Sequence, residues 1–340
     1  MNIFTLNLIM LGFWSLAFRK HLDPLASSSK ASLFYVIIIS LQLFSIVLLS
    51  PVVSDASVYA QYAEAHYYGN LEIGWRVLSE VSWFVWPNSK SPMLFTSSVL
   101  LISFAVFTIK HSRNLALSYL IFICLGFWGA SFYILRQTAA LAILLFSYSF
   151  IEKRRPLHFV VSVLLATSFH QSAALFILLY PICKVKRSGL YHVVTVYIGL
   201  LFLLVGDQIV SFVSSQFGRI TYELTELSGV SLLILFIGCL LFVEFFNKKS
   251  VDSPFRHAME LSCVLQTLAL HLSVFTRMTW PFSISLTILM PGSFRAIEDK
   301  STRMLSELAF VVFLVFFYLV IQDTGFPGGS DAYYIDPPLN

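Results

Sequence analysis

Arginine and histidine side chains at the ends of apolar runs are the first candidates for chemistry in this sequence. Arg136 and Arg277 each sit at a junction between two apolar runs with almost no loop around them, and His170 lies between two short apolar runs. A guanidinium offers two parallel hydrogen bonds to a phosphate, and a neutral imidazole accepts a proton near physiological pH. These residue types favour phosphate recognition beside a general base. Snorkelling of the arginines to the surface and a capping or packing histidine are the alternatives.

Acidic and aromatic residues gather in the longest polar connection, residues 53 to 91. Asp55, Tyr59, Tyr62 and Glu72 lie in its first half, where alanine, tyrosine and glutamate recur at helical spacing. Aromatic rings interleaved with carboxylates suit sugars, because the CH faces of a sugar stack on rings while its hydroxyls bond to acids. An ordinary belt of interfacial tyrosines and tryptophans is the alternative.

The composition places these residues in a membrane protein. Of the 340 residues, 57% are hydrophobic and only 12% are charged, and the mean hydropathy is +0.80. A soluble chain of this length cannot bury so much apolar surface. A net charge of +4, with the basic residues in short clusters, is not the pattern of a nucleic-acid binder. The four cysteines show no metal-ligand spacing, so we expect neither a disulfide framework nor a zinc site.

The apolar runs predict an all-α polytopic membrane protein with about twelve hydrophobic helical segments, because about 20 apolar residues cross the hydrocarbon layer as a helix. The runs cover approximately residues 2 to 18, 32 to 52, 92 to 109, 115 to 134, 138 to 151, 157 to 169, 171 to 183, 189 to 205, 230 to 246, 258 to 275, 279 to 293 and 306 to 321.

The distribution of basic residues predicts which connections face the cytoplasm. When the connections are numbered alternately, one set holds 17 of the 22 lysines and arginines and the other holds five. Cytoplasmic connections carry the excess of lysine and arginine, so the first set is cytoplasmic and both ends of the chain lie outside. The outer set contains four arginines and a single lysine, which again favours forked recognition of phosphate.

The segment from 157 to 183 predicts a short helical hairpin. Its basic flanks, Arg155 and Lys184, place both of its ends on the cytoplasmic side. Each leg has about 13 residues, or roughly 20 Å of helix, which barely spans the hydrocarbon layer. We therefore expect His170, at the tip, to lie at or below the outer membrane surface and to be enclosed by other helices.

We expect one integral membrane domain over residues 1 to 340 with three outer segments. The first is the loop 53 to 91, in which 75 to 86 reads as an interfacial helix with its tryptophans at headgroup level. The second is the loop 206 to 229, which holds Arg219 and Tyr222, and the third is the tail 322 to 340, an extended cap or a disordered end. Three acids near cytoplasmic helix ends, Glu244, Glu260 and Glu307, are expected to pair with neighbouring basic residues, and a proton pathway is the alternative.

Several short motifs, in their order along the chain, resemble the EpsG-like group of Wzy-type O-antigen and polysaccharide polymerases. They are Asp55-x-x-x-Tyr59-x-x-Tyr62, Glu72-x-Gly74, Arg136-Gln137-x-x-Ala140 and Phe169-His170-x-Ser172-Ala173. The similarity covers about residues 30 to 185. Gly218-Arg219-x-x-Tyr222 and Arg277 add weaker support.

The resemblance implies a bacterial inner-membrane enzyme that joins O-antigen or capsule repeat units on the periplasmic side. In such an enzyme a glycan on undecaprenyl pyrophosphate is transferred to a sugar hydroxyl of the next lipid-linked unit. The implied fold is an all-helical membrane bundle similar to lipid-dependent glycosyltransferases of the GT-C type. The implied partners are undecaprenyl-pyrophosphate-linked glycans and membrane lipids, with room for a protein that regulates chain length.

Within this reaction the residues take distinct expected roles. Arg136 and Arg277, with Arg219 as a third contact, are expected to bind the departing pyrophosphate. His170 is the first choice for the base that activates the hydroxyl, and Asp55 or Glu72 is the second. The residues expected to contact substrate are Gln137, Tyr59, Tyr62 and Tyr222.

No cofactor or metal is expected, and the sequence contains no Walker A, dinucleotide-binding or serine-hydrolase motif. A divalent cation held by Asp55 or Glu72 on the pyrophosphate is the alternative. Two other function classes stay open. A flippase or transporter also suits twelve apolar segments, although it should show matching half-repeats and charges near the midplane. A membrane acyltransferase that modifies the glycan would again use His170 as a base.

Overall fold

The computed structural model describes residues 3–25, 30–52, 55–217, 229–247, 253–271 and 274–323, and these residues form helices and no strand. The helices are α1 (Ile3–Ala17), α2 (Lys30–Leu49), α3 (Asp55–Glu64), α4 (Ile73–Val85), α5 (Ser91–His111), α6 (Leu115–Cys124), α7 (Leu135–Glu152), α8 (Pro156–Thr167), α9 (Leu179–Ile182), α10 (Gly189–Phe217), α11 (Val230–Phe246), α12 (Pro254–Ala269), α13 (Val274–Ser283), α14 (Leu286–Ala296) and α15 (Lys300–Asp323), with two 3₁₀-helices, η1 (Gly129–Phe132) and η2 (Gln171–Leu178). The outer tail beyond residue 323 lies outside the described residues.

The expectation of an all-helical membrane protein is confirmed. Within the described ranges, four helices are long and apolar enough to cross a membrane: α2, α5, the first 21 residues of α10 (Gly189–Ile209) and Lys300–Val320 of α15. Shorter apolar helices, among them α6, α8 and α11, accompany them. The chain is therefore a multi-pass membrane protein, and the number of twelve crossings stays a prediction.

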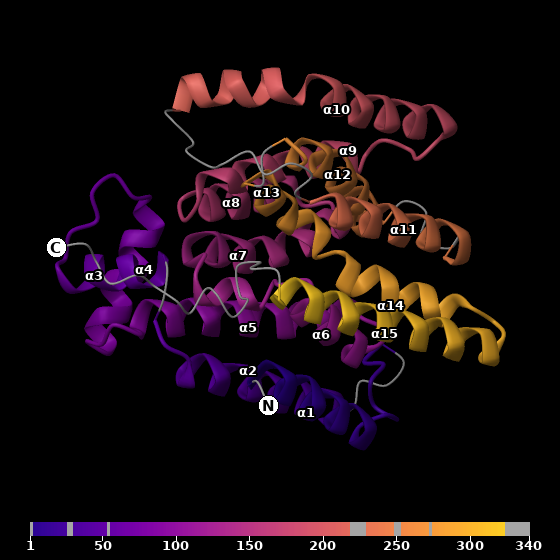
Figure 1. Cartoon of the computed structure of the whole chain (residues 1–340), viewed down its shortest axis with the longest axis horizontal. Coiled ribbons are helices and arrows are strands. Elements are labelled where there is room, and N and C mark those ends of the chain that lie inside the picture. The colour runs from indigo at the N-terminus through magenta and orange to yellow at the C-terminus, as the bar shows by residue number, and fades with distance from the viewer. Residues whose placement is uncertain are drawn as a thin grey trace.

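The long helices lie roughly parallel to the long axis of the molecule, with α7 at the centre (Figure 1). α7 packs against α5 on one side and α8 on the other, and also contacts α12 and α13. Aromatic rings fill the space between α5 and α6, where Phe104 stacks on Phe122 with ring centroids 3.8 Å apart and meets Tyr119 edge to face. The short helices α3 and α4 lie together at one end of this bundle (Figure 1).

Two interruptions in the apolar runs create the helix ends that matter for function. The run 115 to 134 is split, because α6 ends at Cys124 and Gly126 takes a φ of +79°, a left-handed conformation that suits glycine after a helix. The chain then turns through η1, so that α7 begins at Leu135 and Arg136 falls in its first turn. The second interruption lies between α8 and η2, where a three-residue turn holds His170.

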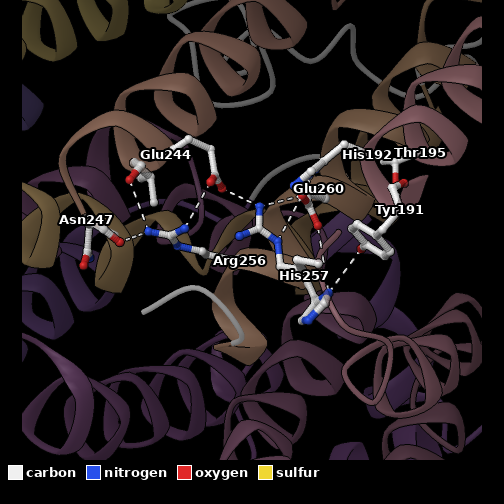
Figure 2. A network of polar contacts seen from close by, with 10 residues as sticks. Tyr191, His192, Thr195, Glu244, Asn247, Arg256, His257 and Glu260 are labelled. Carbon is white, nitrogen blue, oxygen red and sulfur yellow. Dashed lines mark hydrogen bonds and ion pairs between the residues drawn. The ribbon is translucent and has the colours of Figure 1, made fainter. Parts of the chain in front are cut away.

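A network of buried ion pairs joins helix ends of the part predicted to face the cytoplasm (Figure 2). The Arg187 guanidinium contacts Glu260, with Nη2 and Oε1 2.7 Å apart, and also reaches Glu244. Arg256 pairs with the other oxygen of Glu244 at 3.1 Å. The side chains of Arg187, Arg256 and Glu260 are at most 2% exposed. The expected pairing of Glu244 and Glu260 with basic residues is confirmed, and it ties the segment before α10 to α11 and α12. Glu307 instead accepts a 2.7 Å hydrogen bond from the side-chain amide of Asn114.

Removing one acid from this network should destabilise the protein. Glu260→Gln leaves buried arginines with an uncompensated charge, and such a loss typically costs about 3–5 kcal/mol of unfolding free energy. Thermal unfolding of the purified protein in detergent measures it. Arg295→Gln is the control, because its ion pair with Asp23 is long, at 3.8 Å, and the arginine side chain is 58% exposed. A pair of this kind contributes less than about 1 kcal/mol, so equal losses in the two variants contradict the prediction.

Candidate active site

Six of the residues singled out in the sequence line one cavity of about 160 Å³. The cavity lies at the end of the bundle that carries α3 and α4. Its lining residues come from α3, the start of α7, the α8–η2 turn and α13, and they are Asp55, Tyr59, Ile134, Arg136, Gln137, His170, Ser172, Arg277 and Met278. Residues that are far apart in the sequence thus share one enclosed space.

Arg136 is held in place by polar and aromatic contacts. Its Nε donates a hydrogen bond of 2.8 Å to the hydroxyl of Tyr59, and its Nη1 donates one of 2.6 Å to Oε2 of Glu72. The guanidinium carbon lies 5.5 Å from the centroid of the Tyr59 ring, within cation–π range. Tyr59 in turn packs edge to face against the buried Trp75. The Arg136 side chain therefore lines a polar cavity and is bound by Tyr59 and Glu72. A snorkelling arginine would instead extend to the membrane surface.

Glu72 connects the arginine to the turn that holds His170. While Oε2 accepts from Arg136, Oε1 accepts a 3.3 Å hydrogen bond from the backbone amide of Gln171 and lies 3.7 Å from Nδ1 of His170. Burial alone raises the pKa of the Glu72 carboxyl, but hydrogen bonds and the positive charge of Arg136 outweigh it and lower the pKa below its usual value. Glu72 is consequently an anion at neutral pH.

Close backbone packing fixes the relative position of Glu72 and His170. Glu72 directly precedes α4, and the amide of Gly74 donates a 2.8 Å hydrogen bond to the carbonyl of Ser168 in the α8–η2 turn. A Cβ atom at position 74 would lie 2.5 Å from Oγ of Ser168 and 2.8 Å from the Phe169 ring. Only glycine lets the two segments approach this closely.

His170 is neutral at physiological pH. Burial and the positive charge of Arg136 lower the pKa of its imidazole to about 4, with a further contribution from Arg277 and a partial offset by Glu72. Its Nδ1 is buried without a hydrogen-bond partner among the described residues. A neutral ring has a nitrogen lone pair available, which a base requires.

Arg277 supplies a second guanidinium to the cavity. Its backbone carbonyl accepts a hydrogen bond from the side-chain amide of Gln137, which ties α13 to the start of α7. Among the described residues, no carboxylate lies within ion-pair distance of Arg277. Among the described residues, the cavity therefore combines one arginine that is paired with a glutamate and one that is not paired with a carboxylate.

Tyr62, a predicted site residue, does not line this cavity, and two others lie outside the described residues. Tyr62 is partly buried and packs against the hydrophobic core instead of lining the cavity. Arg219 and Tyr222 lie outside the described residues, so their roles stay predictions.

Sequence reasoning did not assign a role to Ser172, to the amide of Gln171 or to Gly74. Ser172 lines the cavity, and the other two position Glu72 and the turn. The sequence offered one signal for this close contact, the glycine two residues after Glu72. A single sequence does not show which of its glycines are required for close packing.

The fold and the cavity define a class: a multi-pass helical membrane protein with two guanidiniums and a neutral imidazole enclosed at one end. The sequence matches the EpsG family over residues 32–330, and the chain belongs to this family. That family indicates a polysaccharide polymerase role with glycosyltransferase-like chemistry and lipid-linked glycan substrates. Neither the curated proteins nor the solved structures contain a match to the chain.

A methyl group at position 74 should displace the turn that carries His170. In Gly74→Ala the added Cβ meets Ser168 and Phe169 at distances that force a shift, and a displacement of about 1 Å can lower the rate of a positioned reaction by about 100-fold. We expect a folded protein with at least about tenfold slower glycan elongation. Gly12→Ala is the control, because no atom lies within 4 Å of the corresponding Cβ. Elongation rates of purified, monodisperse variants provide the measurement, and an unchanged rate in Gly74→Ala refutes this positioning.

Proposed function

We propose that the protein is a polymerase that transfers a growing glycan from undecaprenyl pyrophosphate to a sugar hydroxyl of the next lipid-linked repeat unit. The observation that carries the proposal is the convergence of Arg136, Arg277 and His170 on one cavity. The excess of lysine and arginine in the opposite set of connections supports a periplasmic cavity in a bacterial inner membrane.

In the proposed reaction the bond between the anomeric carbon and the pyrophosphate oxygen breaks, and its electron pair leaves with the pyrophosphate. The hydroxyl oxygen of the acceptor sugar forms the new bond to the anomeric carbon, and its proton passes to a base. Pyrophosphate is a good leaving group, so fixed positive charge aids its departure more than a strong acid does. One such donor in a water-poor site contributes about 3–4 kcal/mol. Arg136 and Arg277 are the groups placed to supply it.

His170 is the base in this proposal, and substrate binding tunes it. A pKa of about 4 makes the imidazole of the empty cavity a weak base. Part of that lowering comes from Arg136 and Arg277, whose charges a bound pyrophosphate would offset. The pKa of His170 then rises toward the working pH. Glu72, with its carboxylate 3.7 Å from Nδ1, stabilises the imidazolium that forms.

A flippase is the main competing function, and the structure offers it little support. Charged residues of a transporter gather near the midplane of the membrane. In the described part of this chain, the cavity beside α3 and α4 lies at helix ends, and so does the ion-pair network at the junction of α10, α11 and α12. A membrane acyltransferase requires a site for an acyl donor, and no observation on the described residues supports such a site.

Loss of either key side chain should stop polymerisation in a reconstituted system. Purified protein with a lipid-linked repeat unit should produce a ladder of glycans on a gel. His170→Ala should slow elongation by about 100-fold to 10,000-fold, and Arg136→Ala by at least about 100-fold. Arg295→Ala, at an exposed position away from the cavity, is the control.

Substrate that crosses the bilayer without a ladder indicates a flippase. Elongation that EDTA abolishes restores the alternative of a divalent cation on Asp55 or Glu72.

The pH dependence should separate the free enzyme from its substrate complex. His170 acts as a base only in its neutral form. A lowered pKa of its imidazole therefore keeps it in the active form down to a lower pH. We expect kcat/KM, which reports the free enzyme, to show no histidine limb between pH 5 and 8, because the pKa of His170 is about 4. We expect kcat, which reports the complex, to fall below about pH 6, near the ordinary histidine pKa of about 6.5. Initial rates over this range provide the test, and a limb near pH 6.5 in kcat/KM contradicts it.

A further inference from the structure

Helix α4 has an apolar face that no other described element covers. Ile73, Val77, Val81, Phe84 and Val85 are 65%, 55%, 49%, 88% and 63% exposed. At about 100° per residue these positions span an arc of roughly 120° on one side of the helix. We call them the α4 apolar face.

The opposite side of α4 is buried. Trp75, Ser79 and Ser82 on that side are fully enclosed, and the helix packs against α3 and α5. α4 is thus firmly seated on the protein through one face while five large apolar side chains project from the other. Contiguous apolar patches of this kind mark surfaces that meet a partner or a membrane.

The connection to α5 fixes the level at which α4 lies. α4 ends at Val85 and the membrane-spanning α5 begins at Ser91, so five residues separate them. Lys90, the residue before α5, donates a 2.9 Å hydrogen bond to the carbonyl of Leu48 in the last turn of α2, a second spanning helix. The ends of two spanning helices meet here, and this places the adjoining end of α4 at the membrane surface.

Aromatic residues at the same end agree with this level. Trp83 lies in the last turn of α4 and Trp86 directly follows it. Tryptophan is enriched at the boundary between headgroups and hydrocarbon. Figure 1 shows α4 at the end of the bundle, beside α3.

We propose that the α4 apolar face is a lipid-docking surface, embedded in the outer leaflet at the boundary between headgroups and acyl chains. The membrane-spanning α5 that follows α4 also carries exposed apolar side chains, among them Val99, Ile102 and Val106. Because α4 joins α5 at the level where two spanning helices end, the occupant of the α4 apolar face is the lipid that surrounds those helices, and not a soluble partner.

This docking sets the depth of the cavity, a consequence that rests on the proposed function. Ile73 of the α4 apolar face directly follows Glu72, which binds Arg136 and lies beside His170. Anchoring α4 in the leaflet thus holds the arginines at the depth of lipid headgroups. A diphosphate on a lipid carrier reaches them without leaving the membrane.

Spin-label depth measurements test the docking directly. Cysteines introduced as Val77→Cys, Val81→Cys and Phe84→Cys are labelled in the full-length protein, reconstituted in phosphatidylethanolamine–phosphatidylglycerol vesicles. For each spin label, the rate of collision with oxygen, which concentrates in hydrocarbon, is compared with the rate of collision with a water-soluble nickel chelate. Tyr67→Cys is the matched control, because Tyr67 is 68% exposed in the connection before α4. The same treatment of unsubstituted protein gives the signal from label attached to the four native cysteines.

We expect the three labels on the α4 apolar face to favour oxygen over nickel at least fivefold more than the Tyr67→Cys label does. Nickel access equal to that of the control overturns the proposal, because the face is then in water. Shielding from both reagents also overturns it, because a second copy or another protein then covers the face.

A paired substitution connects docking with turnover. Val77→Asp combined with Val81→Asp places charges in the leaflet, and we expect the apparent KM for a lipid-linked repeat unit in vesicles to rise at least tenfold. Unfolding in detergent and kcat at saturating substrate should change little. If the labels report lipid contact but wild-type protein forms no ladder, the proposed polymerase function fails while the docking surface stands.

Discussion

The ion pair between Glu72 and Arg136 is the interaction on which the arrangement of the cavity depends. A guanidinium at the end of an apolar run requires a partner, and the Glu72 carboxylate provides it at 2.6 Å. The other oxygen of that carboxylate accepts the amide of Gln171. One side chain thereby joins the start of α7, the segment before α4 and the turn of His170. Any change that moves α4 also moves the charges that surround the imidazole.

The cavity and the ion-pair network around Arg187 differ in how their charges are balanced. In the network around Arg187, both buried arginines contact glutamate, and Glu244 bridges them. At the cavity, Arg136 has its glutamate, whereas Arg277 has no carboxylate within ion-pair distance among the described residues. In the network around Arg187, removal of one partner would leave a buried charge without compensation, so the network constrains how the helices pack. At the cavity, an arginine without a described carboxylate partner is consistent with the diphosphate-binding role proposed above.

The sequence predicted the helices better than the contacts between them. The run 230 to 246 coincides with α11, because apolar length alone specifies a membrane helix. The run 115 to 134 is instead broken at Gly126. Hydropathy did not predict this turn, because its flanking residues are as apolar as those of a continuous helix. Arg136 and Arg277 stood out as charges in apolar surroundings. The pairing of Glu72 with Arg136 and the packing of Gly74 on Ser168 join residues 64 and 94 positions apart in the chain, and only the folded structure shows such contacts.

In the proposed reaction, the charges that would bind an anionic donor also keep His170 a weak base while the cavity is empty. Burial, Arg136 and Arg277 lower the pKa of His170 in the empty cavity, so the imidazole has little tendency to take a proton from water. In the reaction proposed above, a bound diphosphate would offset the charges of the two guanidiniums and strengthen the base when a leaving group is present. Because the charge that raises the basicity would be that of the leaving group itself, the proposed mechanism couples proton removal to departure of the diphosphate. Under this proposal, transfer to a sugar hydroxyl is favoured only when the donor is in place.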